Sequence, residues 1–214
     1  MHIHAINLPR FVIVGSGVIP KVKEVLLRLN VEDQVLLISG ENYTREPASL
    51  VKDSVEELGL TIHSIGVREA SPAGVETVEA RIRETGASMV ISVGGGKTID
   101  VAKLASNKQN IPFISVPTSA AHDGISSPIA SIKGANGSLS VMAQPPVALL
   151  ADTDIIEKSP RRFTISGCGD IIAKYTAVRD WGLAHRLRGE YYGDYAASLA
   201  LMSAELVHEN IDLV

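Results

Sequence analysis

Three consecutive glycines and a lysine stand between a buried apolar run and a helical pattern in the stretch SVGGGKTID, residues 92–100. Glycine allows a backbone to approach a ligand closely and to adopt unusual dihedral angles. A helix that begins near Thr98 points its free amides and its positive dipole end at the same place. Lys97 either adds charge there or points to solvent. These residues predict a phosphate site, and tight packing between strand and helix is the alternative.

Two familiar phosphate motifs do not fit this sequence in detail. The loop of the nucleotide hydrolases needs glycine five positions before Gly96, where this chain has Ile91. A second glycine-rich turn, GSGVIP at residues 15–20, resembles the dinucleotide fingerprint, but Pro20 replaces its third glycine. Such a turn still brings amides to the start of a helix, so pyrophosphate binding and a plain tight turn both remain open.

Two later segments carry polar side chains that suit a binding or catalytic site. The stretch PTSAAHDGISSP, residues 117–128, follows a buried apolar run and holds hydroxyls, a histidine and an aspartate. Ligands of parallel sheets bind at the carboxyl ends of the strands, so this loop is either a ligand-binding loop or a turn-rich connector. In ISGCGDIIAKY, residues 165–175, Asp170 is expected in the first turn of a helix. There it serves either as a routine helix cap or as a metal ligand.

Short apolar runs rich in β-branched residues alternate with helical patterns through the first two-thirds of the chain. Buried strands are predicted at residues 10–17, 33–42, 60–66, 87–96, 111–119 and 147–150. Residues 71–86 predict a helix with Ser71 as N-cap, Pro72 in the first turn and Gly86 as C-cap. A hairpin-like excursion turns at GANG, residues 134–137. Strands buried on both faces and separated by helices indicate a parallel sheet with right-handed crossovers.

After residue 152 the pattern changes to helices, because residues 169–189 and 191–211 both carry helical spacing of apolar residues. The predicted fold class is therefore α/β, with a parallel-sheet, Rossmann-like N-terminal domain followed by the start of an all-helical domain. Residues 1–152 are predicted to form the dinucleotide-binding domain, and residues 153–214 the first helices of an incomplete metal-binding domain. So short a helical region makes a poor independent core, which predicts that the chain is part of something longer.

Composition narrows the class of partner. The 214-residue chain is 45% hydrophobic and has a net charge of −4, which gives no general attraction to nucleic acid or anionic membranes. No stretch approaches the roughly 20 apolar residues of a membrane span. A single cysteine, Cys168, excludes an internal disulfide framework. We expect a cytoplasmic protein that binds a small molecule and forms a homo-oligomer. The aromatic residues Trp181, Tyr191 and Tyr192 either pack between helices or belong to an interface, and an exposed aromatic pair would promote association.

The stretches GGGKTIDVAK, PTSAAHDGISSP and GCGDIIAK, in this order and spacing, resemble the polyol dehydrogenases related to glycerol dehydrogenase and dehydroquinate synthase. The His-Asp-Gly and Ser-Ser-Pro residues of the second stretch favour the sn-glycerol-1-phosphate dehydrogenase branch of that family. The resemblance covers essentially the whole chain. It implies a reversible, NAD(P)H-dependent reduction of dihydroxyacetone phosphate to sn-glycerol 1-phosphate, as used in archaeal-type ether phospholipid synthesis.

The resemblance also implies roles for particular residues. Asp123 would contact the substrate, and Asp170 would be both a zinc ligand and a neighbour of the substrate. Zinc would polarise the ketone while the cofactor supplies hydride. The residues implied in cofactor binding are Gly94, Gly95, Gly96, Lys97, Thr98, Ile99, Asp100, Thr118, Ser119, Ala120, Ala121 and Ser127.

Several points remain open at the level of sequence. Members of this family complete the zinc site with two histidines from later helices and extend past position 214, which implies a truncated chain that is inactive alone. Glu41 lies near the end of the second strand, where NAD-specific proteins often place an acidic residue, and it either serves that role or points to solvent. We therefore predict that both NAD and NADP are tolerated. The alternatives are a glycerol dehydrogenase, a dehydroquinate-synthase-like lyase and a catalytically silent dinucleotide-binding module.

Overall fold

The computed structural model describes residues 6–41, 43–134 and 137–213, which form two compact units. The first, here called the sheet unit, comprises residues 1–119 and 124–159. The second, the helical unit, comprises residues 120–123 and 160–214. Each unit is built around its own secondary structure.

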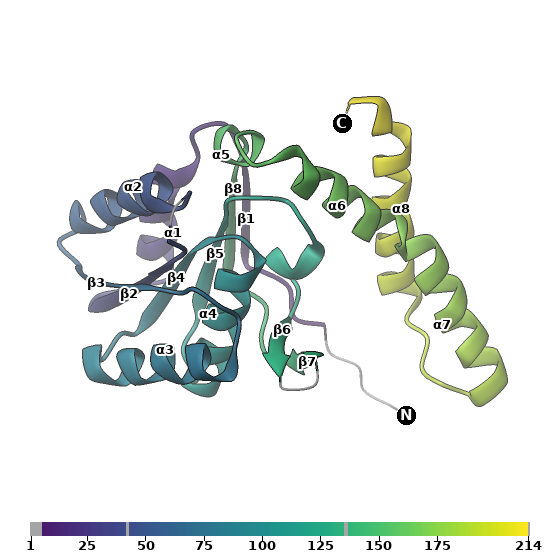
Figure 1. Ribbon diagram of the computed structural model, residues 1–214, viewed down its shortest axis with the longest axis horizontal. Coiled ribbons are helices and arrows are strands. Elements are labelled where there is room, and N and C mark those ends of the chain that lie inside the picture. Colours follow the sequence, from purple (N-terminus) through teal and green to yellow (C-terminus); the bar gives the residue numbers. More distant parts are fainter. Residues whose placement is uncertain (1–5, 42, 135–136, 214) are drawn as a thin grey trace. The chain divides into compact units, whose positions relative to one another are not determined.

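A six-stranded parallel sheet forms the centre of the sheet unit (Figure 1). In spatial order its strands are β1 (Phe11–Gly15), β8 (Ala148–Asp152), β5 (Phe113–Pro117), β4 (Met89–Gly94), β2 (Gln34–Ser39) and β3 (Thr61–Gly66). The central strands β4, β5 and β8 are buried along their whole length, as strands covered on both faces must be. The predicted α/β, Rossmann-like fold class is thereby confirmed.

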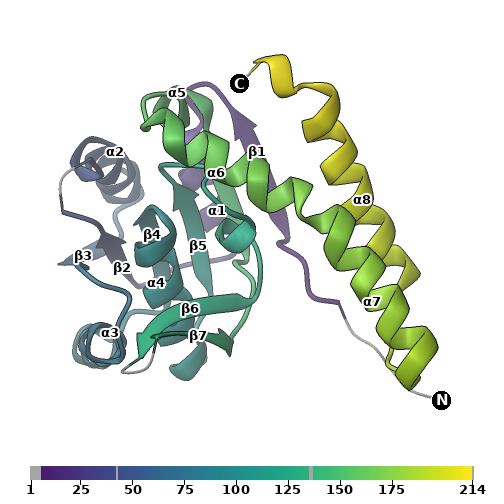
Figure 2. The same cartoon turned by 45° about the vertical axis from the view of Figure 1, so that its right-hand side comes forward.

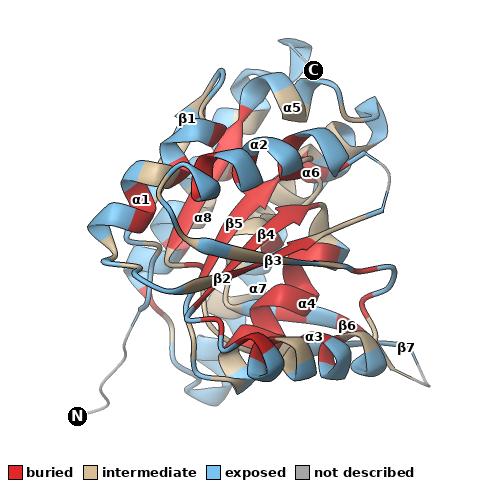
Figure 3. Cartoon of the chain, turned by 90° about the vertical axis from the view of Figure 1, so that its left-hand side faces the viewer, coloured by how far each residue is buried: buried red, intermediate tan, exposed pale blue. Residues whose placement is uncertain are grey.

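Helices cover both faces of this sheet. The helices of the sheet unit are η1 (Ile19–Lys21), α1 (Val22–Arg28), α2 (Arg45–Glu56), α3 (Pro72–Thr85), α4 (Gly96–Lys108) and α5 (Thr153–Glu157). Helices α1 and α2 contribute to one buried apolar cluster and helices α3 and α4 to the other, and buried residues follow the strands and α4 in Figure 3. The caps predicted for α3 are confirmed, since Ser71 Oγ accepts from Gly74 N at 3.2 Å and Gly86 has φ 65°.

A two-stranded antiparallel ribbon interrupts the parallel pattern, as the hairpin prediction required. It consists of β6 (Ile129–Gly134) and β7 (Gly137–Met142). Ala130 and Ile132 of β6 are buried and pack into the cluster formed by α3 and α4. The middle of the predicted GANG turn, residues 135–136, lies outside the described residues.

Three long helices make up most of the helical unit: α6 (Arg161–Ile172), α7 (Lys174–Arg188) and α8 (Asp194–Glu209). Two short 3-10 turns also occur in the described residues: η2 (Asp123–Ile125), which begins in the helical unit and ends in the sheet unit, and η3 (Ile211–Leu213). Helices α7 and α8 run side by side in Figure 2. None of the helices in the described residues is long and apolar enough to cross a membrane.

The start of α6 differs from the sequence prediction. Residue Asp170 was expected in the first turn of a helix, and that expectation is wrong, because α6 begins at Arg161 after the N-cap Pro160. Proline favours a helix start, and the helix then tolerates Gly167 and Gly169 in its interior. Asp170 therefore stands in the last turn of α6, where a cap role at the helix start does not apply.

The division into a dinucleotide-binding domain, residues 1–152, and a metal-binding domain, residues 153–214, stays a prediction.

Candidate functional site

The triglycine stretch forms the junction between β4 and α4 at the carboxyl edge of the sheet. Gly94 ends β4, Gly95 is the N-cap of α4 with extended backbone, and Gly96 opens the helix. The carbonyl of Gly95 accepts from the amides of Thr98 (3.0 Å) and Ile99 (3.2 Å). The earlier amides of Gly96 and Lys97 donate to no other described residue, as expected for the first turn of a helix. They are therefore available to an anion.

Gly94 and Gly95 lack a side chain for different reasons. A Cβ built on Gly94 would lie 2.7 Å from Thr98 Oγ1, so the packing of strand against helix requires glycine there. A Cβ on Gly95 would meet only Ser119 Oγ, at an ordinary 3.6 Å, and the φ of Gly95, −82°, suits any residue. The fold itself does not require glycine at position 95. Because residue 95 has no side chain, the amides of Gly96 and Lys97 at the start of α4 stay accessible.

The neighbouring strand ends lie against this loop. Thr118 N, directly after β5, donates to Gly94 O at 3.0 Å, and the side chain of Ser119 is buried beside Gly95. On the other side, a Cβ on Gly40 after β2 would lie 3.6 Å from Thr98 Oγ1. The structure thus brings the predicted cofactor residues of β4, α4 and the end of β5 together in one place.

Three residues of the first turns of α4 have different surroundings, although sequence reasoning grouped them as cofactor-binding. Lys97 is exposed, and no hydrogen bond or ion pair joins its ammonium group to another described residue. Ile99 is fully buried in the apolar cluster, so only its backbone faces the loop. Asp100 is 4% exposed, and its Oδ1 lies 3.4 Å from Lys103 Nζ. Their predicted role in cofactor binding stays a prediction.

Lys103 is a residue that the sequence analysis missed. Its side chain is fully buried, and Nζ donates to Gly124 O at 2.8 Å and to Ile129 O at 2.7 Å. The ammonium therefore fastens both ends of the segment 124–129 to α4. Ser127, another predicted cofactor residue, lies within that segment. The signal in the sequence was the i,i+3 spacing of Asp100 and Lys103 on a helix whose surroundings are otherwise apolar.

The glycine-rich turn at residues 15–20 already holds an anion of the protein itself. The buried carboxylate of Asp152, at the end of β8, accepts from Gly17 N and Ile19 N, each at 3.2 Å, and from Asp154 N at 3.1 Å. The side-chain hydroxyl of Ser16 donates to Asp154 at 2.7 Å. The amides of this turn are occupied, so of its two open interpretations the structure favours the tight turn.

A polar cluster lies in the helical unit. Asp123 N donates to Asp170 Oδ2 at 2.9 Å, and Lys174 Nζ donates to Asp123 Oδ2 at 2.5 Å. Asp123 and Asp170, predicted as substrate contacts, are thus adjacent, and Lys174 joins them. Sequence reasoning did not single out Lys174, although it stands one helical turn after Asp170 in the same quoted motif.

Gly167 explains how the loop and the helix come close in this unit. A Cβ on Gly167 would lie 1.9 Å from Ala120 O, so only glycine allows the backbone of residues 120–123 to cross α6 there. Asp170, one turn later on the same face, then receives the amide of Asp123. Ala120 and Ala121, predicted to line the nicotinamide side, belong to this crossing.

The charge of Lys174 depends on its neighbours. Burial opposes the charged form, but the hydrogen bond to Asp123 and the negative charges of Asp123 and Asp170 outweigh it, so the pKa of Lys174 is raised above its usual value. The side chains of Lys174 and Asp123 remain 30% and 43% exposed. Lys174 is therefore a firmly charged ammonium that compensates a pair of carboxylates.

The described residues do not by themselves fit a metal ion. Among them, no three histidine, cysteine, aspartate or glutamate side chains gather as a catalytic zinc site requires. Asp170 offers one carboxylate, and one of its oxygens already accepts from Asp123 N. The prediction of Asp170 as a zinc ligand stays a prediction.

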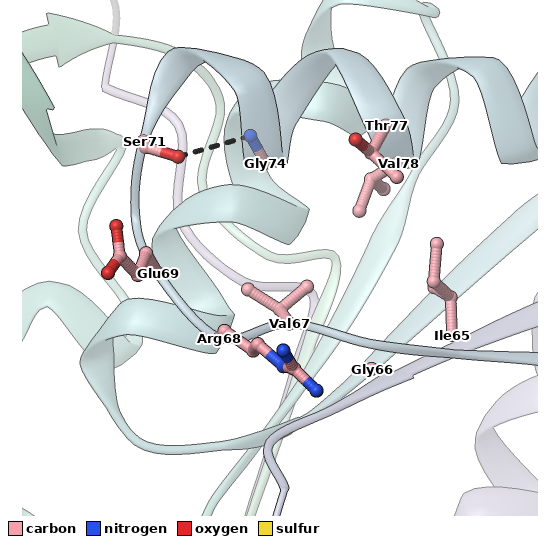
Figure 4. A pocket seen from close by; sticks show the side chains of 9 residues that line it. All are labelled: Ile65, Gly66, Val67, Arg68, Glu69, Ser71, Gly74, Thr77 and Val78. Carbon is pink, nitrogen blue, oxygen red and sulfur yellow. Dashed lines mark hydrogen bonds between the residues drawn. The ribbon is translucent and has the colours of Figure 1, made fainter.

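A hollow of about 250 Å³ opens at the carboxyl end of β3, between that strand end and the first two turns of α3 (Figure 4). Apolar side chains from Ile65, Val67 and Val78 line it together with Arg68 and Glu69. Because β3 runs parallel to β2 and β2 runs parallel to β4, the hollow and the glycine loop both lie at the carboxyl ends of the strands.

A family model described as iron-containing alcohol dehydrogenase matches residues 13–160. The chain belongs to this family. Among solved structures, a probable glycerol dehydrogenase from Sinorhizobium meliloti 1021 superposes with a TM-score of 0.84 at 21% identity, over 98% of this chain and 58% of that one. NADH-dependent butanol dehydrogenase A from Thermotoga maritima gives a TM-score of 0.76 at 18% identity, over 99% of this chain and 58% of that one.

Curated relatives are more similar to this chain in sequence than the solved structures are. The glycerol-1-phosphate dehydrogenase [NAD(P)+] of Pyrococcus abyssi is 44% identical over 99% of this chain and 61% of its own length. The protein of the same name from Methanosarcina acetivorans is 46% identical over 97% of this chain and 58% of its own length. The chain thus spans about three-fifths of the length of these relatives.

Proposed function

We propose that the protein is an NAD(P)-dependent dehydrogenase that interconverts dihydroxyacetone phosphate and sn-glycerol 1-phosphate. The observation that carries the proposal is the amide pair of Gly96 and Lys97, open behind a glycine that the fold does not require at position 95. The identity of 44–46% with proteins named glycerol-1-phosphate dehydrogenase [NAD(P)+] supports the choice of substrate.

In this proposal the cofactor pyrophosphate binds at the N-terminus of α4. The amides of Gly96 and Lys97 donate to phosphate oxygens, and the positive end of the helix dipole favours their charge. Lys97 is free to turn its ammonium toward the phosphates. Thr118 and Ser119, next to the glycine loop, contact the cofactor beyond the pyrophosphate.

Asp123 and Asp170 act on the substrate in the proposal. In the reducing direction hydride from the nicotinamide adds to the ketone carbon, which leaves oxidised NAD(P)⁺, and the oxygen takes a proton from the solvent to become the secondary hydroxyl. Carboxylates accept hydrogen bonds from hydroxyl groups, so Asp123 and Asp170 would orient the triose through its hydroxyls. Lys174 keeps Asp123 in place and compensates its charge. A metal bound through Asp170 would polarise the ketone, and it would need further ligands, since no three ligand side chains gather among the described residues.

A second candidate is a dehydrogenase for unphosphorylated polyols. It is favoured by the structural likeness to a probable glycerol dehydrogenase, although at 21% identity this likeness shows the fold alone. The two candidates differ only in the need to bind a substrate phosphate.

Two measurements test the proposal. The first is binding of NADH and NADPH to this chain, followed by nicotinamide fluorescence. The second is oxidation of the cofactor by the protein, with dihydroxyacetone phosphate compared against dihydroxyacetone, and with the metal content measured in the same sample. Turnover of the phosphorylated triose alone supports the proposal. Equal turnover of both, or no binding of either cofactor, contradicts it.

A further inference from the structure

An ion pair joins the ends of two neighbouring strands beside the glycine loop. β2 ends at Ser39 and β3 at Gly66, and Val67 N donates to Ser39 O at 2.8 Å, which holds the two strand ends in register. Arg68 Nε then donates to Glu41 Oε1. The sheet thus places one exposed cation and one exposed anion together at its carboxyl edge.

This pair lies on the path that leads outward from the helix amides of α4. Ser39 pairs with Val93 on one side and with Gly66 on the other, so the order along the edge is glycine loop, Glu41, Arg68. Neighbouring strands are about 5 Å apart, which puts Arg68 about 10 Å from β4. In a dinucleotide whose pyrophosphate sits on α4, the adenosine ribose is the next group along this edge.

We propose that Glu41 and Arg68 read the 2′ position of the adenosine ribose and let the protein accept both NADH and NADPH. This inference rests on the proposed function. With NADH, the Glu41 carboxylate accepts the hydrogen bond of the 2′-hydroxyl while Arg68 stays paired with Glu41. With NADPH, Arg68 turns from Glu41 to the 2′-phosphate.

The exposure of the pair makes this exchange possible. The side chains of Arg68 and Glu41 are 82% and 49% exposed, and ion pairs this open to water contribute little stability. A phosphate monoester carries more negative charge than a carboxylate and accepts two parallel hydrogen bonds from a guanidinium. The phosphate therefore competes successfully with Glu41 for Arg68. Arg68 also borders the hollow between β3 and α3, so it has room to turn (Figure 4).

The experiment compares the affinities of this chain for NADPH and NADH in four proteins: wild type, Arg68→Ala, Glu41→Gln and the control Arg83→Ala. Arg83 is an exposed arginine in the last turn of α3 that also pairs with a glutamate, Glu79. We expect Arg68→Ala to weaken NADPH binding roughly tenfold or more, since a hydrogen bond to a charged group is lost, and to change NADH binding little. Glu41→Gln should weaken NADH and strengthen NADPH. Arg83→Ala should change neither.

Each result decides one point. A shift of the NADPH-to-NADH ratio in Arg68→Ala, and in the opposite direction in Glu41→Gln, supports the inference. Unchanged ratios in both variants, with both cofactors bound by the wild type, overturn the inference and leave the proposed function intact. Failure of the wild type to bind either cofactor overturns the proposed function, and this inference with it.

Discussion

Serine in place of Gly95 separates the stability of the fold from the binding of the cofactor. Gly95 is the N-cap of α4, and a Cβ there meets nothing closer than Ser119 Oγ at 3.6 Å. Serine is a better N-cap than glycine by a few tenths of a kcal/mol. Replacing glycine at an ordinary φ adds about 0.4–1 kcal/mol through the unfolded chain. Gly95→Ser should therefore be roughly 0.6–1.4 kcal/mol more stable than the wild type.

Cofactor affinity should move in the opposite direction. The new side chain occupies the space in front of the amides of Gly96 and Lys97, so a pyrophosphate can no longer reach them. Hydrogen bonds to charged groups are worth about 1.5–3 kcal/mol each, so binding of NADH should weaken tenfold or more. Thermal unfolding by circular dichroism and a fluorescence titration with NADH measure the two effects on the same sample.

Gly94→Ala is the matched control for that experiment. Its Cβ would lie 2.7 Å from Thr98 Oγ1, so this variant should lose stability by about 1–3 kcal/mol from overpacking. A stable Gly95→Ser protein that binds NADH as tightly as the wild type would refute the reasoning, because position 95 would then not face the ligand.

Three further predictions follow from contacts in the two units. Lys103→Met removes the buried cation that contacts Asp100 and the carbonyls of Gly124 and Ile129, so chemical denaturation should show an unfolding free energy lower by about 3–5 kcal/mol. The control Lys108→Met, on the exposed side of α4, should change the unfolding free energy by less than about 0.5 kcal/mol. Gly167→Ala forces a methyl group to within 1.9 Å of Ala120 O and should destabilise the fold by about 1–3 kcal/mol or more. The control Gly169→Ala, whose methyl group meets nothing within 4 Å, should stabilise the fold by up to about 1 kcal/mol because alanine is the better helix former. Equal melting temperatures of the two variants would contradict the crossing of residues 120–123 over α6. The folded-state pKa of Lys174 is raised, so its ion pair with Asp123 should stabilise the fold fully below the ordinary lysine pKa of about 10.4 and lose this effect as the pH rises above it. The difference in unfolding free energy between wild type and Lys174→Met should therefore be below about 1 kcal/mol and constant from pH 7 to 10. A difference that vanishes below pH 9 would contradict this direction of the pKa shift.

The sequence predicted the sheet well because its signals are local. The central strands β4, β5 and β8 are short runs buried on both faces, and the caps of α3, Ser71 and Gly86, are recognisable from residue type alone. The triglycine loop could be predicted for the same reason, since it lies between a strand and a helix that are contiguous in the chain.

The remaining parts depend on contacts between distant residues. Asp152 fills the amides of the turn at residues 15–20 from more than 130 positions away, and no local pattern announces that contact. Lys174 and Asp123 meet only because Gly167 lets the loop cross α6. The helix start at Arg161 was missed because the glycines at 167 and 169 imitate a helix boundary.

The central claim, that the dinucleotide pyrophosphate binds at the N-terminus of α4, is tested most directly by the amide resonances of the chain during titration with NADH. The account predicts that the amides of Gly96 and Lys97 shift most, while those of Gly17 and Ile19, held by Asp152, stay in place. The largest shifts in the turn at residues 15–20, with Gly96 and Lys97 unmoved, would contradict it.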